Sequence, residues 1–209
     1  MASRRRREGF ARTVKGLECW LDPDLAAAIR RSAREVQELI SSEPAVEGLA
    51  GLDPEESSEA GTFSELQSML ASGTLAGLAG LGGEVPPLSE DPALARLFPI
   101  AYEDPEQAEE YRRFTYTELH AAKVAGLEQL SAQLAEMAPD IVLDEASAAV
   151  WLGALNDLRL VIGSRIGVTE DNAEEFESLP PTDMRALAYA LYVILTSLQD
   201  SLVEALAGW

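Results

Sequence analysis

The chain has 209 residues, one cysteine, one histidine and a formal net charge of −20 at pH 7. This length is enough for one substantial hydrophobic core without metals or disulfides. A single cysteine excludes an intramolecular disulfide, and there is no Cys/His set for structural zinc. The basic N-terminal stretch is not followed by an apolar run, and polar residues interrupt the later apolar runs. We therefore expect no signal peptide, no membrane span and a cytoplasmic location.

The charge is distributed unevenly along the chain. Residues 1–34 hold nine basic and four acidic residues, a net charge of +5, whereas residues 35–209 hold seven basic and 32 acidic residues, a net charge of −25. Such an acidic body repels phosphate backbones and favours a protein partner with a basic surface. Direct DNA binding is the alternative, and it would need the basic residues near the N-terminus. These are Arg4, Arg5, Arg6, Arg7, Arg30, Arg31 and Arg34.

The first nine residues form a basic arm that we expect to be disordered. From Phe10 to Leu21, apolar and polar residues alternate on both sides of Lys15 and Gly16, which predicts a small β-hairpin. Cys19 falls on the second strand. A buried apolar filler is the favoured interpretation of this cysteine, and a redox-sensing thiol is the alternative.

Asp22 followed by Pro23 predicts the start of a helix that should end before Pro44. The stretch 43–61 is rich in Glu, Ser, Gly and Pro, which predicts a mobile connection, and a short helix is expected behind Thr62. The segment 72–90 is glycine-rich but lacks a preceding strand and a GK[ST] ending. We interpret it as a flexible segment rather than a phosphate-binding loop.

Two more Asp-Pro pairs, at 91–92 and 104–105, predict further helix starts, and Thr117 predicts the N-cap of a long helix that runs to about residue 138. Three aromatic residues, Tyr102, Tyr111 and Phe114, lie among acidic residues between these starts. His120 lacks carboxylate or imidazole companions at a useful spacing, so we expect a surface histidine.

The central prediction is a core helix over residues 150–168, after a short apolar strand at 141–143 that could pair with the hairpin. Its apolar residues recur at intervals of three and four, and Gly167 ends it. Arg159 lies at the edge of the buried stripe and needs a partner, which Asn156 or an acid on a neighbouring helix could supply. These two residues, with Trp151 and Arg165, form the polar cluster that we consider the best candidate site.

Residues 169–181 are rich in acidic side chains. They lack the order of acidic residues that a calcium-binding loop requires, so we expect an exposed linker. The last helix should begin after Pro181 and run to about Ala207, with an apolar face wide enough to pack on two sides, within a bundle or across a homodimer. These elements predict a mainly α fold: a single-domain helical bundle over residues 10–209 with a small N-terminal β-hairpin. They include no catalytic set, so we expect no enzyme, no cofactor and no metal site.

Four stretches of the sequence resemble an actinobacterial family of unknown function that includes a mycobacterial oxidative-stress regulator. They are RLFPIAYEDPEQAEEYRRFT, TELHAAKVAGLEQL, VWLGALNDLRLVIGSRIGV and YVILTSLQDSLVEALA. The resemblance covers about residues 10–207 and is strongest in the second half. It implies a cytoplasmic regulator that senses oxidants through a CxxxC disulfide and then engages a sigma factor of RNA polymerase.

This chain departs from the family pattern at its cysteines. Cys19 has Lys15 and Pro23 where a CxxxC partner would stand, so a disulfide switch within one chain is excluded. What the resemblance then implies is the fold and the protein partner. We rank a non-enzymatic regulator or adaptor first, a DNA-binding regulator second, and an enzyme with a carboxylate site a distant third.

Overall fold

The computed structural model describes residues 9–42 and 88–208. The expected N-terminal arm, with Arg4 to Arg7, lies outside these residues except for Gly9. The connection 43–61, the helix behind Thr62 and nearly all of the glycine-rich segment also lie outside them.

Three short strands form one antiparallel sheet in the order β1-β2-β3: β1 (Ala11–Thr13), β2 (Gly16–Trp20) and β3 (Asp140–Leu143). Leu17 pairs with Leu143 and Cys19 with Ile141, so the predicted hairpin and its pairing with the apolar strand are confirmed. Gly16 has a φ of +132°, and a Cβ there would lie 2.5 Å from the carbonyl oxygen of Leu143. Only glycine fits this turn.

Six helices lie in the described part of the chain, which confirms the mainly α class. Asp22, Asp91, Asp144 and Asp183 are N-caps whose carboxylates accept backbone N–H groups of the first turn, as expected of this residue type. Gly167, with a φ of +74°, ends the central helix as predicted. The helices are α1 (Pro23–Ser41), α4 (Pro92–Leu97), α5 (Pro105–Met137), α6 (Glu145–Ile166), α7 (Ala173–Glu177) and α8 (Met184–Ala207).

Two predictions about helix boundaries are wrong. Thr117 is not an N-cap, because α5 runs without a break from Pro105 and Asp104 caps it through the backbone N–H of Gln107. The acidic linker contains the short helix α7, whose Phe176 is buried and stacks on Tyr189 of α8 with ring centroids 5.0 Å apart.

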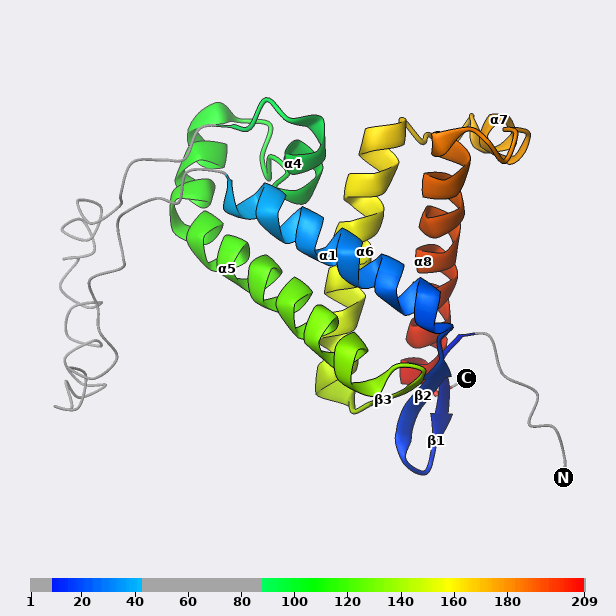
Figure 1. Cartoon of the computed structure of the whole chain (residues 1–209). Coiled ribbons are helices and arrows are strands. Elements are labelled where there is room, and N and C mark those ends of the chain that lie inside the picture. The colour runs from blue at the N-terminus through cyan, green and yellow to red at the C-terminus, as the bar shows by residue number, and fades with distance from the viewer. Residues whose placement is uncertain (1–8, 43–87, 209) are drawn as a thin grey trace, which may run out of the picture. The chain divides into compact units, whose positions relative to one another are not determined.

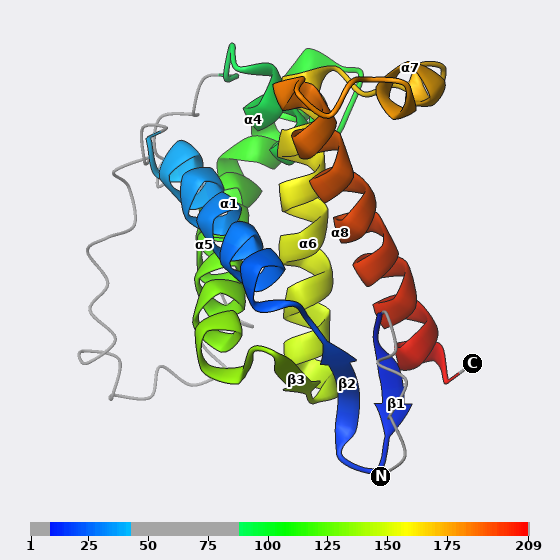
Figure 2. The same cartoon turned by 45° about the vertical axis from the view of Figure 1, so that its right-hand side comes forward.

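The described residues fall into two compact units. One comprises residues 9–42, 89–99 and 120–208, and the other includes residues 88 and 100–119. The expectation of a single domain stays a prediction. In the first unit, α6 and α8 lie side by side, α1 crosses α6, and the sheet lies beside the C-terminal end of α8 (Figures 1 and 2).

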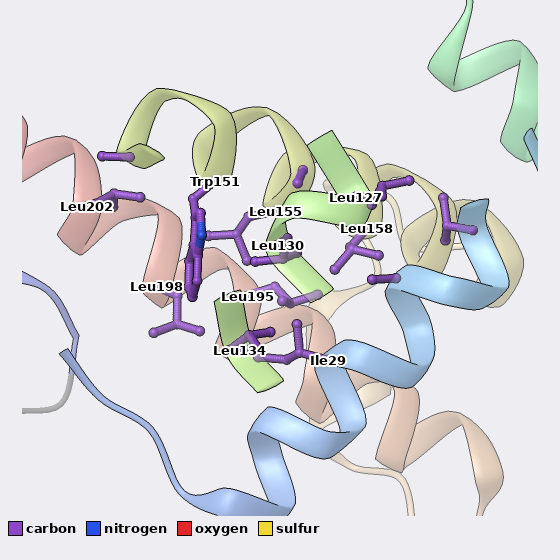
Figure 3. Close-up of a cluster of buried hydrophobic side chains, with 14 of the residues drawn as sticks. Ile29, Leu127, Leu130, Leu134, Trp151, Leu155, Leu158, Leu195, Leu198 and Leu202 are labelled. Atoms are coloured by element: carbon purple, nitrogen blue, oxygen red, sulfur yellow. The ribbon is translucent and has the colours of Figure 1, made fainter. Parts of the chain in front are cut away.

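The core of the first unit surrounds Trp151 of α6, which is fully buried. Figure 3 shows the neighbouring core side chains: Ile29 of α1, Leu127, Leu130 and Leu134 of α5, Leu155 and Leu158 of α6, and Leu195, Leu198 and Leu202 of α8. Among the described helices, α8 alone is long and apolar enough to cross a membrane by length and composition. Core helices of soluble proteins that are mostly buried pass the same test, but only 17% of this stretch of α8 is buried. The cytoplasmic location stays a prediction.

Candidate functional site

Three residues of the predicted polar cluster on α6 contact three different helices. Trp151 contacts α5, Arg159 contacts α8 and Arg165 contacts α4. Asn156 is partly buried. These contacts give Trp151, Arg159 and Arg165 roles in helix packing, and the assignment of the cluster as a binding site stays a prediction.

Trp151 is a core residue with one polar bond. Its indole Nε1 donates to Oε1 of Gln133 on α5 at 2.7 Å, and Gln133 in turn donates to the hydroxyl of Ser147 at 3.2 Å. The ring of Phe10 meets it edge-on, with centroids 5.7 Å apart. The indole therefore ties the N-terminal strand and α5 to α6, with its N–H satisfied as burial requires.

Arg159 joins α6 to α8. Its Nη1 donates to Oε1 of Gln199, and the guanidinium lies over the ring of Tyr192, 5.6 Å from the centroid. A Cβ at Gly163 would come within 3.2 Å of the Tyr192 ring, so this glycine allows the ring to lie against α6. Arg159 thus contacts the side-chain amide of Gln199 and the ring of Tyr192. The expected partner was Asn156 or an acid on a neighbouring helix. The Nε of Arg159 is buried without a hydrogen-bond partner among the described residues.

Arg165 joins α6 to α4. Its two terminal nitrogens donate to both oxygens of Asp91, at 3.0 and 2.6 Å. Asp91 also caps α4 by accepting from the backbone N–H of Ala93 at 2.8 Å. Desolvation acts to raise the pKa of Asp91. The hydrogen bonds from Arg165 and from the backbone outweigh this effect and lower the pKa. One carboxylate therefore starts α4 and fixes it to α6.

Asp157 of α6 and Lys123 of α5 form an ion pair that the sequence pattern did not predict. Lys123 Nζ lies 2.6 Å from the Asp157 carboxylate, and the two side chains are only 16% and 6% exposed. Lys123 also lies 5.9 Å from the ring centroid of Phe98. Burial raises the pKa of Asp157 above its usual 3.8, while the hydrogen bond from Lys123 opposes this. A signal was present, because Asp157 interrupts a helix that is apolar on nearly every side.

His120, expected on the surface, is partly buried in the same region. Its ring stacks on Phe98 with centroids 6.2 Å apart, and its Nε2 lies 3.1 Å from the carbonyl oxygen of Ile40. Among the described residues, no group of three or more His, Cys, Asp or Glu side chains is placed to hold a metal ion.

Cys19 is buried in β2, as the favoured interpretation required, with 4% of its surface exposed. Burial raises the pKa of its thiol from 9.0 to about 11, with a smaller opposing effect of the backbone N–H of Gly9. Oxidants and disulfides react with the thiolate, which is scarce at neutral pH in such a site.

The predicted basic contacts are only partly presented to solvent. On α1, Arg31 and Arg34 are exposed, whereas Arg30 is partly buried and its Nε is enclosed without a hydrogen-bond partner among the described residues. Arg4 to Arg7 lie outside the described residues.

Among the described residues, the most exposed aromatic side chains lie in the second unit. Tyr102 and Tyr111 are each 47% exposed and meet edge-on with centroids 5.6 Å apart, and Phe114, one turn further along α5, is 61% exposed. Exposed acids share this segment: Glu103, Glu110 and Glu118. We call these six residues the aromatic–acidic surface. Aromatic residues are enriched in protein interfaces, and the acids complement basic groups.

The comparison with protein families identifies the chain's relatives. A family model described as a domain of unknown function, DUF2017, matches residues 5–206. The chain belongs to the DUF2017 family. This match confirms the resemblance inferred from the sequence, since it extends over nearly all of the described residues.

The DUF2017 chain is similar to mycobacterial proteins named oxidative stress regulator AosR. The Mycobacterium leprae protein is 33% identical over 131 residues, which is 56% of this chain and 59% of the relative. The Mycobacterium tuberculosis and Mycobacterium bovis proteins are 31% identical over 132 residues, with the same coverage. The match thus spans less than two thirds of the length of these relatives. No solved structure matches this DUF2017 chain.

Proposed function

We propose that this protein is a non-enzymatic regulator of the oxidative-stress response that acts by binding a protein partner. The names of its relatives support a regulatory role. We further propose that the partner is a sigma factor or another component of RNA polymerase, in keeping with the resemblance noted in the sequence.

The aromatic–acidic surface carries this proposal. Tyr111 and Phe114 expose large apolar rings on the same side of α5, flanked by Glu110 and Glu118, which suits a partner that offers both apolar and basic side chains. Residues 100–119 hold six acidic and only two basic residues, Arg112 and Arg113, so this segment as a whole repels a phosphate backbone and favours a protein over a nucleic acid.

The sensing step must differ from a disulfide switch within one chain. The sequence contains one cysteine, and Cys19 is buried with a raised pKa. We propose that this chain keeps the partner-binding role of the family and receives its signal by other means than a CxxxC pair.

The test is binding of the full chain to purified RNA polymerase, with and without its stress-responsive sigma factors. We expect capture by the wild type and loss of capture in the double variant Tyr111→Ala/Phe114→Ala. Both residues are exposed, so the fold should survive, which circular dichroism checks. The matched control is Val14→Ala, a fully exposed apolar residue of the hairpin turn. Equal capture by the double variant, or none by the wild type, would refute the proposal.

Direct DNA binding is a second candidate, favoured by the exposure of Arg31 and Arg34 on α1. It predicts binding to duplex DNA at about 0.15 M salt that weakens as salt rises. Arg31→Gln/Arg34→Gln should reduce this binding and leave polymerase capture unchanged. No binding to duplex DNA under these conditions would leave the protein partner as the remaining candidate.

A further inference from the structure

The N-terminal half of α8 exposes a row of large apolar side chains. Met184, Leu187, Leu191 and Ile194 follow one another at intervals of three, four and three, so they lie on one side of the helix. Met184 is 83%, Leu187 73% and Ile194 36% exposed, and Leu191 is partly buried. We call these four residues the α8 seam.

The α8 seam continues the core-facing stripe of the same helix. Further along α8, Leu198 and Leu202 occupy the same side and are buried. Figures 1 and 2 show that α1 lies nearest to α8 at its own N-terminal end and then diverges from it. The seam therefore has the composition of a core face along a part of α8 that α1 does not cover.

No charged side chain occurs in α8 between Arg185 and Asp200. Arg185 is itself paired with Asp183 at 2.9 Å. In a chain with a net charge of −20, three of the four seam residues, Leu187, Leu191 and Ile194, thus lie in an uncharged stretch, and Met184 lies between the paired residues Asp183 and Arg185. A partner recognised by charge would find nothing to pair with here, whereas a second copy, which is repelled elsewhere, meets no like charge within the seam.

The spacing of the seam is also self-complementary. Intervals of three, four and three read the same in both directions, so an antiparallel copy of α8 can match the seam to itself about a point near Tyr189. Met184 would then face Ile194 of the partner subunit, and Leu187 would face Leu191 of the partner subunit. An interface between identical surfaces related by a two-fold axis requires this reciprocity.

We propose that two copies of this chain form a two-fold dimer through their α8 seams. The seam spans eleven residues, from Met184 to Ile194, which is about 15 Å of helix, and a stable interface needs about 800 Å² per partner. The dimer should therefore dissociate on dilution. It should also tighten as salt rises, because screening weakens the repulsion between two acidic bodies while apolar burial remains.

The test is sedimentation equilibrium of the full chain from about 1 to about 200 µM. We expect a monomer–dimer equilibrium for the wild type and at least tenfold weaker association for Leu187→Glu, which places like charges in the interface. Met184→Glu should act in the same way. The matched control is Val203→Glu, an equally drastic change on another face of α8, where Val203 is 50% exposed. Circular dichroism checks that each variant folds.

Three results would overturn the proposal: a wild type that is monomeric at every concentration, a dimer that Leu187→Glu leaves intact, or a dimer that weakens with salt. Binding of a monomeric wild type to phosphatidylcholine vesicles, lost in Leu187→Glu, would assign the seam to a lipid surface instead. The outcome is separate from the proposed function, because the Tyr111→Ala/Phe114→Ala variant should dimerise normally.

Discussion

At the scale of single residues, Lys123 and Asp157 form the least exposed ion pair among the described residues. Two charges with so little exposure stabilise a fold only as long as both are present, because removal of one leaves the other buried and unpaired. Lys123→Met should lower the free energy of unfolding by about 3 kcal/mol. Urea denaturation followed by circular dichroism would measure this loss.

The double variant Lys123→Met/Asp157→Leu is the control for this pair. It removes both charges and replaces them with apolar side chains of similar size, which is often neutral for stability. We expect it to lose less stability than either single variant. A loss of stability in the double variant equal to the sum of the two single losses would mean that the two side chains act independently. That result would refute the importance of the pairing.

Cys19 yields a second prediction at this scale. A pKa raised from 9.0 to about 11 means about a hundredfold less thiolate near neutral pH than for an ordinary cysteine, before burial restricts access further. We expect a thiol-reactive disulfide reagent to modify the native chain at least a hundredfold more slowly than the urea-unfolded chain. Equal rates in the two states would show that the thiol is available for redox sensing.

Residue partners were the hardest feature to predict from sequence. The position of Arg159 at the edge of the buried stripe followed from helical spacing, but its partner Gln199 lies 40 positions away on another helix. The spacing of residues in the sequence predicts the side of its own helix on which a residue lies. The residues that this side contacts depend on how α6 packs against α8. The same limit hid the pairing of Asp157 with Lys123.

At the scale of elements, helix starts were predictable because the signal is local. An aspartate before a proline satisfies the free N–H groups of the first turn, and this rule located α1, α4 and the true start of α5. The extra start at Thr117 was wrong because a threonine can also occupy a helix interior when the helix before it continues. Helix α7 was missed because only one of its residues, Phe176, is buried, and the sequence could not show that Phe176 stacks on Tyr189.

The N-cap of α6 gives a prediction for an element. Asp144 accepts the backbone N–H of Ser147 at 2.7 Å, and this bond holds the pKa of the carboxyl below its usual 3.8. Asp144→Ala should lower the urea midpoint, whereas Asp144→Asn, which keeps an acceptor, should lower it less. A depressed pKa means that the stabilising effect is present above about pH 4 and is lost as pH falls through the folded-state pKa.

The difference in stability between the wild type and Asp144→Ala should therefore shrink on acidification below the usual pKa of 3.8. Urea midpoints of the two proteins at a series of pH values would measure it. A difference that is constant across this range would mean that the carboxylate charge contributes nothing to the cap.

At the scale of the whole molecule, the charge distribution dominates. Residues 35–209 carry a net charge of −25, and like charges within a folded chain repel one another. The sequence alone gave this property in full, since charge needs no knowledge of packing. The sequence could not show that α1 leaves the uncharged face of α8 uncovered, because that depends on the angle at which the two helices cross.

Screening should therefore stabilise this protein. Raising NaCl from about 0.01 to about 1 M shortens the screening length from about 30 to about 3 Å, so Tm at pH 7 should rise by several degrees. Leu187→Glu is the protein to use, at one fixed concentration, so that dimer formation does not contribute. Near the isoelectric point of about 4.3, where the net charge vanishes, the same salt step should change Tm far less. An equal rise at both pH values would show that salt acts through the apolar surface rather than through the charge of the acidic body.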